Sequence, residues 1–489
     1  MLKEENLKMK FAHATKWSSI TEIAAKIVNP IISMILARLI SPEAFGVVAT
    51  VTMIMSFADM FTDAGFQKYL VQHDFKNENE EYENANVAFW TNFGISIILW
   101  GFIIIYNKQI AILIGIPGLG NVIAVACFQL LLTSFSSIQI ALFRRNFDFK
   151  TLFLVRMVSA CIPFIITIPL AFLGFSYWAL IIGSIFMQFL NAIILTIKSK
   201  WKPKLSYNVK ILKEMLSFSI WSLIEAISIW FSAWIDIFVI GNSFNKYYLG
   251  LYKTSIAMVS SLIGLITAST VPVLFSALSR LKNDETQFRY MFFKTQQLVS
   301  IFIFPLGMGI FLYRDLATNI LLGSQWSEAS RIIGVYALAH SILVVFGYYC
   351  SEVYRAKGKP GLSFLVQVLY LLVIIPTYII SSKYGFWFFV YARSCTIIEF
   401  VLVHLLTMKV AMGISIIKTI KNVFPTLIAT FAMGLLGYFL QQVNSGLTWS
   451  LISIVICVLV YFGILYMIPE IRKEIDWILI RLKIKLYNN

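Results

Sequence analysis

Long hydrophobic runs recur along the whole chain and are separated by short polar breaks. Runs of about 18 to 25 mostly apolar residues are long enough to cross the ~30 Å hydrocarbon core of a bilayer as helices. The pattern predicts fourteen membrane-spanning helices, at residues 17–40, 44–66, 86–106, 119–142, 152–173, 177–197, 215–240, 250–276, 297–313, 331–353, 362–382, 386–408, 423–441 and 449–468. The sequence therefore predicts an all-α integral membrane protein with several spans.

Strongly polar residues within three of these spans each fall on one face of their helix. With nearby serines and threonines, these faces carry Glu22, Lys26 and Asn29 in the first span, Asp59 and Asp63 in the second, and Glu225 and Asp236 in the seventh. Because a charge at mid-membrane costs about 3 kcal/mol, such a face turns toward protein or water. We interpret the three faces as the lining of a central water-filled cavity. The structural alternative is that Glu22 and Lys26, four residues apart, neutralise each other.

Four further charged residues lie inside the predicted spans. Arg38 stands near the end of the first span, where a long side chain can reach the membrane surface by snorkelling, as can Arg156. Arg393 and Glu399 lie deeper, in the twelfth span, and being six residues apart they do not share a helix face. Each of these two is either a cavity residue or a structural one.

The distribution of Lys and Arg predicts the orientation of the helices. Of the 40 such residues, 30 fall in the terminal segments and in the loops on one side of the predicted membrane, and 6 fall on the other side. Basic residues favour the cytoplasmic side, so we expect both termini in the cytoplasm. The net charge of +16 belongs to these flanking loops in a chain that is 59% hydrophobic and has a mean hydropathy of +0.80. No nucleic acid partner is expected.

A basic loop at residues 198–214 separates the first twelve spans into two sets of six. A shift of 204 residues superimposes Trp17 on Trp221 and Gly46 on Gly250, with further identities at matching positions. We therefore expect two pseudo-symmetric six-helix lobes around the central cavity, at residues 1–197 and 215–410, related by an axis along the membrane normal. Residues 411–489 add two helices and a basic cytoplasmic tail.

The residues predict neither an enzyme nor a metal site. The short outer loops carry no paired carboxylates suited to sugar chemistry, and the chain has no nucleotide-binding motif. The histidines and cysteines are isolated from one another, and no cofactor is expected. Asp59, Asp63 and Glu225 have no basic neighbour on their own helix. We therefore treat H⁺ and Na⁺ as candidate coupling ions at these carboxylates.

Seven short motifs occur in an order that is similar to a known transporter family. They are "KWSS", "LARLISPEAFG", "ADMFTDAGF", "LFRRNFDFK", "SYWAL", "PVLFSALSRLKND" and "LLGSQW". Together they resemble the polysaccharide-transport branch of the multidrug/oligosaccharidyl-lipid/polysaccharide exporter superfamily. Within that branch, the chain is most similar to the colanic-acid and teichuronic-acid exporters among the Wzx-type flippases. The resemblance covers about residues 14 to 410.

The resemblance implies translocation of an undecaprenyl-diphosphate-linked oligosaccharide across the bacterial cytoplasmic membrane by alternating access. It also implies partners among membrane lipids and the polysaccharide polymerase and export machinery. By the same resemblance, we expect the last two helices to guide the lipid tail. A diphosphate needs cations, so we expect Lys26 to be its main contact, supported by Arg393 and Arg38. Two alternatives stay open: a cation-coupled drug antiporter of the same superfamily, which would have twelve spans, and a membrane glycan polymerase or ligase.

Overall fold

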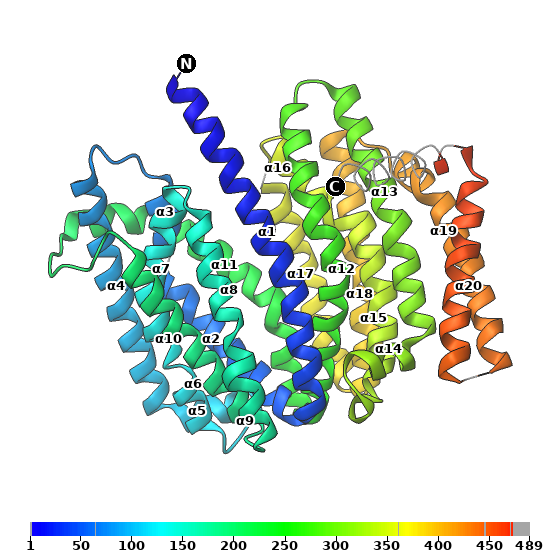
Figure 1. Cartoon of the computed structure of the whole chain (residues 1–489), viewed down its shortest axis with the longest axis horizontal. Helices are drawn as coiled ribbons and strands as arrows, with labels where there is room; N and C mark the ends of the chain where they lie inside the picture. The colour runs from blue at the N-terminus through cyan, green and yellow to red at the C-terminus, as the bar shows by residue number, and fades with distance from the viewer. Residues whose placement is uncertain (1, 64, 360, 445, 470, 473–489) are drawn as a thin grey trace. The chain divides into compact units, whose positions relative to one another are not determined.

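The computed structural model describes most of the chain. It covers residues 2–63, 65–359, 361–444, 446–469 and 471–472, without the side chains of residues 2–16, 18–19, 22–23, 63, 217–222 and 224–225. Within these ranges every regular element is a helix (Figure 1). Thirteen helices of this described part are long and apolar enough to cross a membrane, and they match the predicted spans from 44–66 onward. The remaining predicted span, 17–40, lies in helix α1 (Leu2–Leu39). The prediction of an all-α membrane protein is confirmed.

The chain divides by internal contacts into two compact units, residues 1–254 and 255–489. This division falls within helix α12, so it places α11 and the start of α12 in the first unit. The lobe boundaries drawn from the repeat, at 198–214 and 410, rest on the sequence and stay a prediction.

The helices of unit 1 begin and end as follows: α1 (Leu2–Leu39), α2 (Pro42–Asp63), α3 (Phe66–Gln72), α4 (Glu78–Ile105), α5 (Asn107–Leu113), α6 (Gly120–Ala126), α7 (Gln129–Arg145), α8 (Phe149–Ala160), the π-helical turn η1 (Pro163–Thr167), α9 (Ile168–Phe172), α10 (Tyr177–Lys198) and α11 (Val209–Ser243).

Helix α12 (Lys246–Arg280) begins in unit 1, and the helices of unit 2 follow it: α13 (Glu285–Leu312), α14 (Arg314–Leu321), η2 (Ser324–Trp326), α15 (Ala329–Leu343), the π-helical turn η3 (Val344–Tyr348), α16 (Cys350–Ala356), α17 (Gly361–Ser382), α18 (Phe386–Met412), α19 (Ile416–Val443) and α20 (Leu447–Tyr466).

Side-chain caps fix where several helices start. Asn77 accepts a hydrogen bond from the backbone N–H of Glu80 at the start of α4, and Asp148 accepts one from Thr151 at the start of α8. Asp284 does the same for α13. Because a cap satisfies N–H groups that the helix leaves unpaired, it sets the first turn even where that turn is polar. The helices are therefore longer than their apolar runs.

Helix α7 forms the centre of unit 1, where it contacts α2, α3, α4, α8 and α10. Its buried face carries Ser137 and Gln139 as well as apolar residues such as Ile138. The amide of Gln139 donates to Thr196 on α10 at 3.2 Å. Lipid cannot satisfy polar groups, so these side chains bond to neighbouring helices and lock them together.

The starts of α2 and α12 meet at two glycines. A methyl group added at Gly46 would overlap the backbone carbonyl of Lys246, and one added at Gly250 would overlap that of Pro42. Small residues let two helix backbones approach this closely. The two glycines are the same pair that the 204-residue repeat superimposes.

Unit 2 is built around α13 and α15, with α18 packed on α15 and α19 packed on α13. Helix α20 packs against α19, and the two are drawn side by side in orange and red in Figure 1. Buried Met433, Cys457 and Tyr461 join these two helices to Ile301 of α13 in one apolar cluster.

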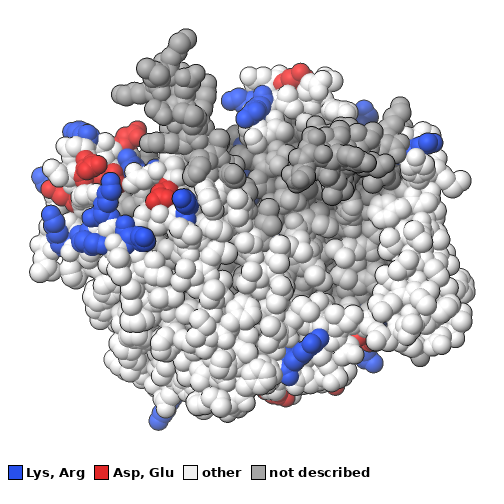
Figure 2. Space-filling view, in the orientation of Figure 1, with Lys and Arg blue, Asp and Glu red and all other residues white. Residues whose placement is uncertain are grey.

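Charged side chains in unit 1 gather at the end that carries α3. On the face drawn in Figure 2, Lys, Arg, Asp and Glu cluster there, and the helix flanks next to them are largely uncharged. The connections from α7 to α8 and from α10 to α11 lie at this end, with Arg144, Arg145, Lys198 and Lys200. This pattern is typical of a protein whose helix flanks face lipid.

Candidate functional site

A polar pocket lies inside unit 1, where residues from α2, α3, α4, α7 and α11 meet. Its volume is about 400 Å³. It is lined by Ser56, Asp59, Met60, Thr62, Gly65, Gln67, Lys68, Asn92, Thr133, Ser137, Leu223 and Ala226. Hydroxyl, amide, carboxylate and ammonium groups therefore surround a single space within a membrane protein. Below we refer to it as the polar pocket.

Hydrogen bonds between helices hold this lining in place. The indole N–H of Trp230 on α11 donates to the hydroxyl of Ser56 on α2 at 3.0 Å. The amide of Asn92 on α4 donates to the hydroxyl of Ser137 on α7 at 2.8 Å. Asn92 and Ser137 are both buried, so this bond is shielded from competition by water. The pocket wall is thus built from side chains with fixed orientations.

Helix α3 closes one side of the polar pocket through Gly65, Gln67 and Lys68. Phe66 and Leu70 on its other face are fully buried in an apolar cluster with α4 and α7. Gly65 has a φ of +79°, a conformation that glycine adopts without strain, and it turns the chain into α3.

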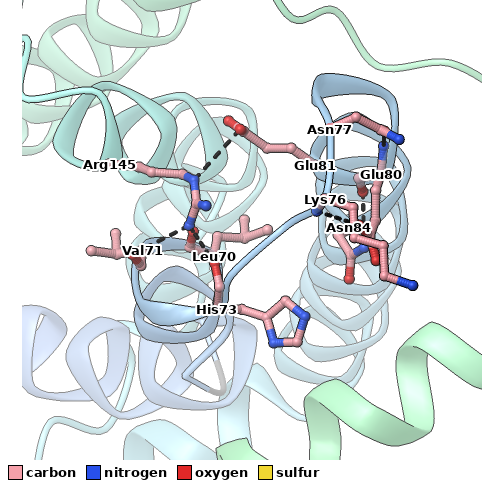
Figure 3. Close-up of polar contacts among 9 residues, drawn as sticks. All are labelled: Leu70, Val71, His73, Lys76, Asn77, Glu80, Glu81, Asn84 and Arg145. Atoms are coloured by element: carbon pink, nitrogen blue, oxygen red, sulfur yellow. Dashed lines mark hydrogen bonds and ion pairs between the residues drawn. The ribbon is translucent and has the colours of Figure 1, made fainter. Parts of the chain in front are cut away.

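Arg145, the last residue of α7, fastens the end of α3 (Figure 3). Its Nη1 donates to the backbone carbonyls of Leu70 at 3.0 Å, Val71 at 3.4 Å and His73 at 2.6 Å. Its Nε lies 3.5 Å from the carboxylate of Glu81. A guanidinium with several donors is suited to carbonyl groups that a helix end leaves unpaired. Arg145 is therefore a positioning residue for the α3 side of the pocket.

The start of α4 is fixed beside this contact, also in Figure 3. The carboxylate of Glu80 accepts from the backbone N–H of Lys76 at 2.6 Å, and the Glu80 N–H donates to the Asn77 side chain at 2.9 Å. Burial raises the pKa of Tyr69 on α3, and the negative charges of Glu214 and Glu80 raise it further, so this phenol stays neutral. Polar contacts thus hold both the end of α3 and the start of α4.

The site residues predicted on α1 and α2 lie in different surroundings. Asp59 is half-buried and lines the polar pocket. Asn29 lines another pocket, described below, and Lys26 is half-buried while Arg38 is exposed. The side chains of Glu22 and Asp63 lie outside the described residues.

The predicted residues of α11 and α18 have more defined surroundings. Asp236 is buried and accepts a hydrogen bond from the hydroxyl of Tyr252 at 2.9 Å. Arg393, in unit 2, lies over the ring of Tyr336 at 5.3 Å. Glu399 on the same helix has one carboxylate oxygen that is buried and hydrogen-bonded by no described residue. The side chain of Glu225 lies outside the described part of the chain.

Several residues that line or position the polar pocket were not predicted from the sequence. Asn92, Thr133 and Ser137 lie within predicted apolar spans, and their polar side chains there were the available signal. Lys68 and Arg145 carried no such signal, because basic residues next to a span are expected in any membrane protein.

A second pocket, in unit 2, is almost entirely apolar. It measures about 430 Å³ and lies between α13, α14, α19 and α20, lined by Ile301, Phe302, Pro305, Leu306, Gly309, Ile310, Leu312, Tyr313, Leu316, Ala317, Ile320, Met433, Ile454, Cys457, Val458, Tyr461 and Phe462. The hydroxyls of Tyr313 and Tyr461 donate to Ser453 and to the Ile301 carbonyl, both at 2.9 Å. These internal bonds leave an apolar surface, which we call the apolar pocket.

Thirteen candidate membrane spans in the described residues, together with a polar pocket buried among helices, define a multi-pass membrane protein of the transporter type. The chain belongs to the polysaccharide biosynthesis protein family, whose model matches residues 35–331. The sequence-based resemblance to polysaccharide exporters is thereby confirmed.

Similar proteins align with this chain along most of their length. A membrane protein from the cps region of Klebsiella pneumoniae is 21% identical and is aligned over 95% of this chain and 96% of its own. The lipopolysaccharide biosynthesis protein WzxC of Escherichia coli (strain K12) is 20% identical, over 88% and 89%. The structure of the lipid II flippase MurJ in an inward closed conformation superimposes with a TM-score of 0.74 at 18% identity, covering 92% of this chain and 98% of that one. This likeness shows the fold.

Proposed function

We propose that this protein is a flippase that moves a lipid-linked oligosaccharide across the bacterial cytoplasmic membrane for polysaccharide biosynthesis. Membership of the polysaccharide biosynthesis family and the fold of a lipid flippase support this function. The observation that carries it is the polar pocket, because hydroxyl and amide groups held inside a membrane protein suit a sugar. A transporter of this kind performs no covalent chemistry on its cargo.

Each pocket, taken by itself, suits one chemical part of such a cargo. Sugar hydroxyls would exchange hydrogen bonds with water for hydrogen bonds with Asn92, Thr133, Gln67 and their neighbours. The apolar pocket beside α19 and α20 would take part of the polyprenyl chain, because burying hydrocarbon there needs no hydrogen bonds. This gives the last two helices a role in guiding the lipid.

The diphosphate requires a cation along its path. In the proposed mechanism Lys26 is the principal contact, about 4 Å from the middle of its span at 1.5 Å per residue, with Arg393 and Arg38 in support. The alternative, in which Lys26 pairs with Glu22, predicts that Lys26→Ala and Glu22→Ala each reduce folding and that the double variant recovers. Our proposal predicts that Lys26→Ala folds but does not transport, and that removing Glu22 as well does not restore transport.

The proposed coupling ion is H⁺ or Na⁺, bound at carboxylates of the polar faces. Asp59 lines the polar pocket, and Glu225 belongs to α11, which packs against α2. Asp59→Asn and Glu225→Gln should alter how transport depends on pH between 5 and 8 or on sodium. Normal transport by both variants over that range would exclude these carboxylates as the coupling site.

The proposed orientation places both termini and the α3 end of unit 1 in the cytoplasm. The excess of Lys and Arg on that side supports it. Reporter fusions after Lys200 and Asn283 should report cytoplasm, and fusions near Ser176 and Gln325 should report the outside. An outside signal from the 198–213 loop would contradict the scheme.

Gene deletion tests the proposed function directly. Cells that lack the protein should accumulate an undecaprenyl-diphosphate-linked oligosaccharide on the inner leaflet and lose the polysaccharide on their surface. Mass spectrometry of extracted lipids would identify the accumulated glycan. Normal amounts of that lipid, together with loss of resistance to a drug, would instead indicate the antiporter alternative.

A further inference from the structure

A third pocket, between α1, α7, α8 and α10 of unit 1, has a different composition from the two described above. Its volume is about 450 Å³. It is lined by Thr21, Ala25, Asn29, Ile140, Arg144, Phe149, Leu152, Val155, Arg156, Met157, Ser159, Ala160, Met187, Asn191 and Leu195. Two of these residues are cationic and none of them is acidic. We call it the arginine pocket.

The charges of this pocket favour an anionic ligand with several oxygens. Arg144 lies in the last turn of α7 and Arg156 one helix further on, in α8, and both side chains are exposed. A guanidinium binds phosphate oxygens through paired N–H groups in a fixed plane. The amide of Asn29, from α1, adds a further donor to the lining.

The rest of the wall favours a ligand that also has a hydrocarbon part. Apolar side chains from three helices also line the pocket, namely Ile140, Leu152, Val155, Met187 and Leu195. Inorganic phosphate would gain nothing from such a surface, whereas an acyl or prenyl chain would be removed from water along it. The combination matches an amphipathic anion.

A chain of hydrogen bonds joins the arginine pocket to the polar pocket. Ser159 donates to the carbonyl oxygen of Asn191, whose amide donates to Gln188 at 3.2 Å. The Gln188 amide donates to the hydroxyl of Thr133 at 3.3 Å, and Thr133 lines the polar pocket. Polar residues within a membrane protein often line the path of a polar substrate.

From these observations we propose that the arginine pocket is a second binding site, which holds the phosphate head of a membrane lipid with its chain along the apolar wall. Arg144 and Arg156 contact the phosphate, and Asn29 and Asn191 orient it. The ligand class is a phosphate-headed lipid, whether the polyprenyl carrier or an ordinary phospholipid. The inference depends on the membrane fold and not on which cargo the protein transports.

Binding to the purified full-length protein in detergent tests this proposal. Native mass spectrometry would measure Kd for three probes: undecaprenyl diphosphate, phosphatidylglycerol and inorganic diphosphate. The double variant Arg144→Gln/Arg156→Gln should bind the lipids about tenfold more weakly, which corresponds to ~1.4 kcal/mol. The matched control is Lys150→Gln, which removes an exposed positive charge from α8 outside the pocket and should change Kd less than about twofold.

The three probes distinguish which kind of phosphate-containing molecule the pocket binds. Tighter binding of undecaprenyl diphosphate than of phosphatidylglycerol identifies a loading site for the carrier, and equal binding identifies a general phospholipid site. Leu152→Gln should weaken both lipids while the charges stay in place. The proposal is overturned if inorganic diphosphate binds as tightly as the lipids, or if Lys150→Gln weakens lipid binding as much as the double arginine variant does.

Discussion

The polar pocket of unit 1 and the apolar pocket of unit 2 have similar volumes, about 400 and 430 Å³, but opposite linings. In the polar pocket, directional bonds such as Trp230–Ser56 and Asn92–Ser137 orient the wall. In the apolar pocket the hydroxyls of Tyr313 and Tyr461 are bonded internally, and the lining is almost entirely apolar.

The two linings favour different kinds of ligand surface. Hydrogen bonds are selective because a group left without its partner inside a membrane costs free energy. Apolar contacts are tolerant, because burial scales with area and not with direction. We therefore expect selectivity for the sugar in unit 1 and tolerance of chain length in unit 2.

The largest effect should come from Arg145→Ala, at the α3 side of the polar pocket. The substitution removes three hydrogen bonds to backbone carbonyls and a contact with Glu81, so unfolding should become easier by about 3 kcal/mol. Thermal unfolding in detergent would measure this as a lower Tm. The neighbouring Arg144→Ala should leave the Tm close to that of the unsubstituted protein. Equal destabilisation by both would show that Arg145 does not position α3.

A change that fills the apolar pocket should have the next largest effect. Gly309 lines this pocket, and a Cβ added there meets nothing within 4 Å, so the side chain of Gly309→Leu would start into open space. We expect normal folding and about tenfold slower transport, because the side chain occupies the space proposed for the prenyl chain. The matched control is Gly463→Leu on α20, where a Cβ also meets nothing within 4 Å and which does not line the pocket. Equal rates for the two variants would argue against a lipid in this pocket.

Removal of one hydroxyl group tests the role of the polar pocket. Thr133→Val keeps the shape of the side chain but removes its bond from Gln188 and one polar group of the pocket. Transport should slow about fivefold, as expected for the loss of ~1 kcal/mol of hydrogen bonding. Thr377→Val is the control, because the hydroxyl of half-buried Thr377 donates to the Val373 carbonyl of its own helix and Thr377 does not line the polar pocket. A fivefold loss in the control as well would indicate a general effect on helix packing.

Hydropathy predicted the spans well because apolar length is a local property of the sequence. It placed the helix starts less well, since the run at 86–106 lies in a helix that begins at Glu78, where Asn77 caps two polar turns. Asp59, on the polar face of α2, lines the polar pocket, and its predicted role at the central cavity stays a prediction. The approach of Arg145 to Leu70 joins segments 75 residues apart, and no periodicity in the sequence encodes such a contact.

The smallest expected effect concerns Asp59 and Asp236, two acidic residues of unit 1 that the sequence analysis assigned to the same cavity. Asp59 lines the polar pocket, whereas Asp236 is buried and accepts a hydrogen bond from Tyr252, which is typical of a structural role. A double-mutant cycle with Asp236→Asn and Tyr252→Phe should give a coupling free energy of about 0.6 kcal/mol, the average for such bonds between membrane helices. Unfolding in detergent would measure it.

Transport by the same variants completes this test. If Asp236 is structural, Asp236→Asn and Tyr252→Phe should leave the dependence of transport on pH and sodium unchanged, because neither variant alters a group that lines the polar pocket. Asp59→Asn should change that dependence. A zero coupling energy, together with loss of ion dependence in Asp236→Asn alone, would reverse the assignment. Asp236 would then be the coupling residue, and the bond from Tyr252 would be incidental to it.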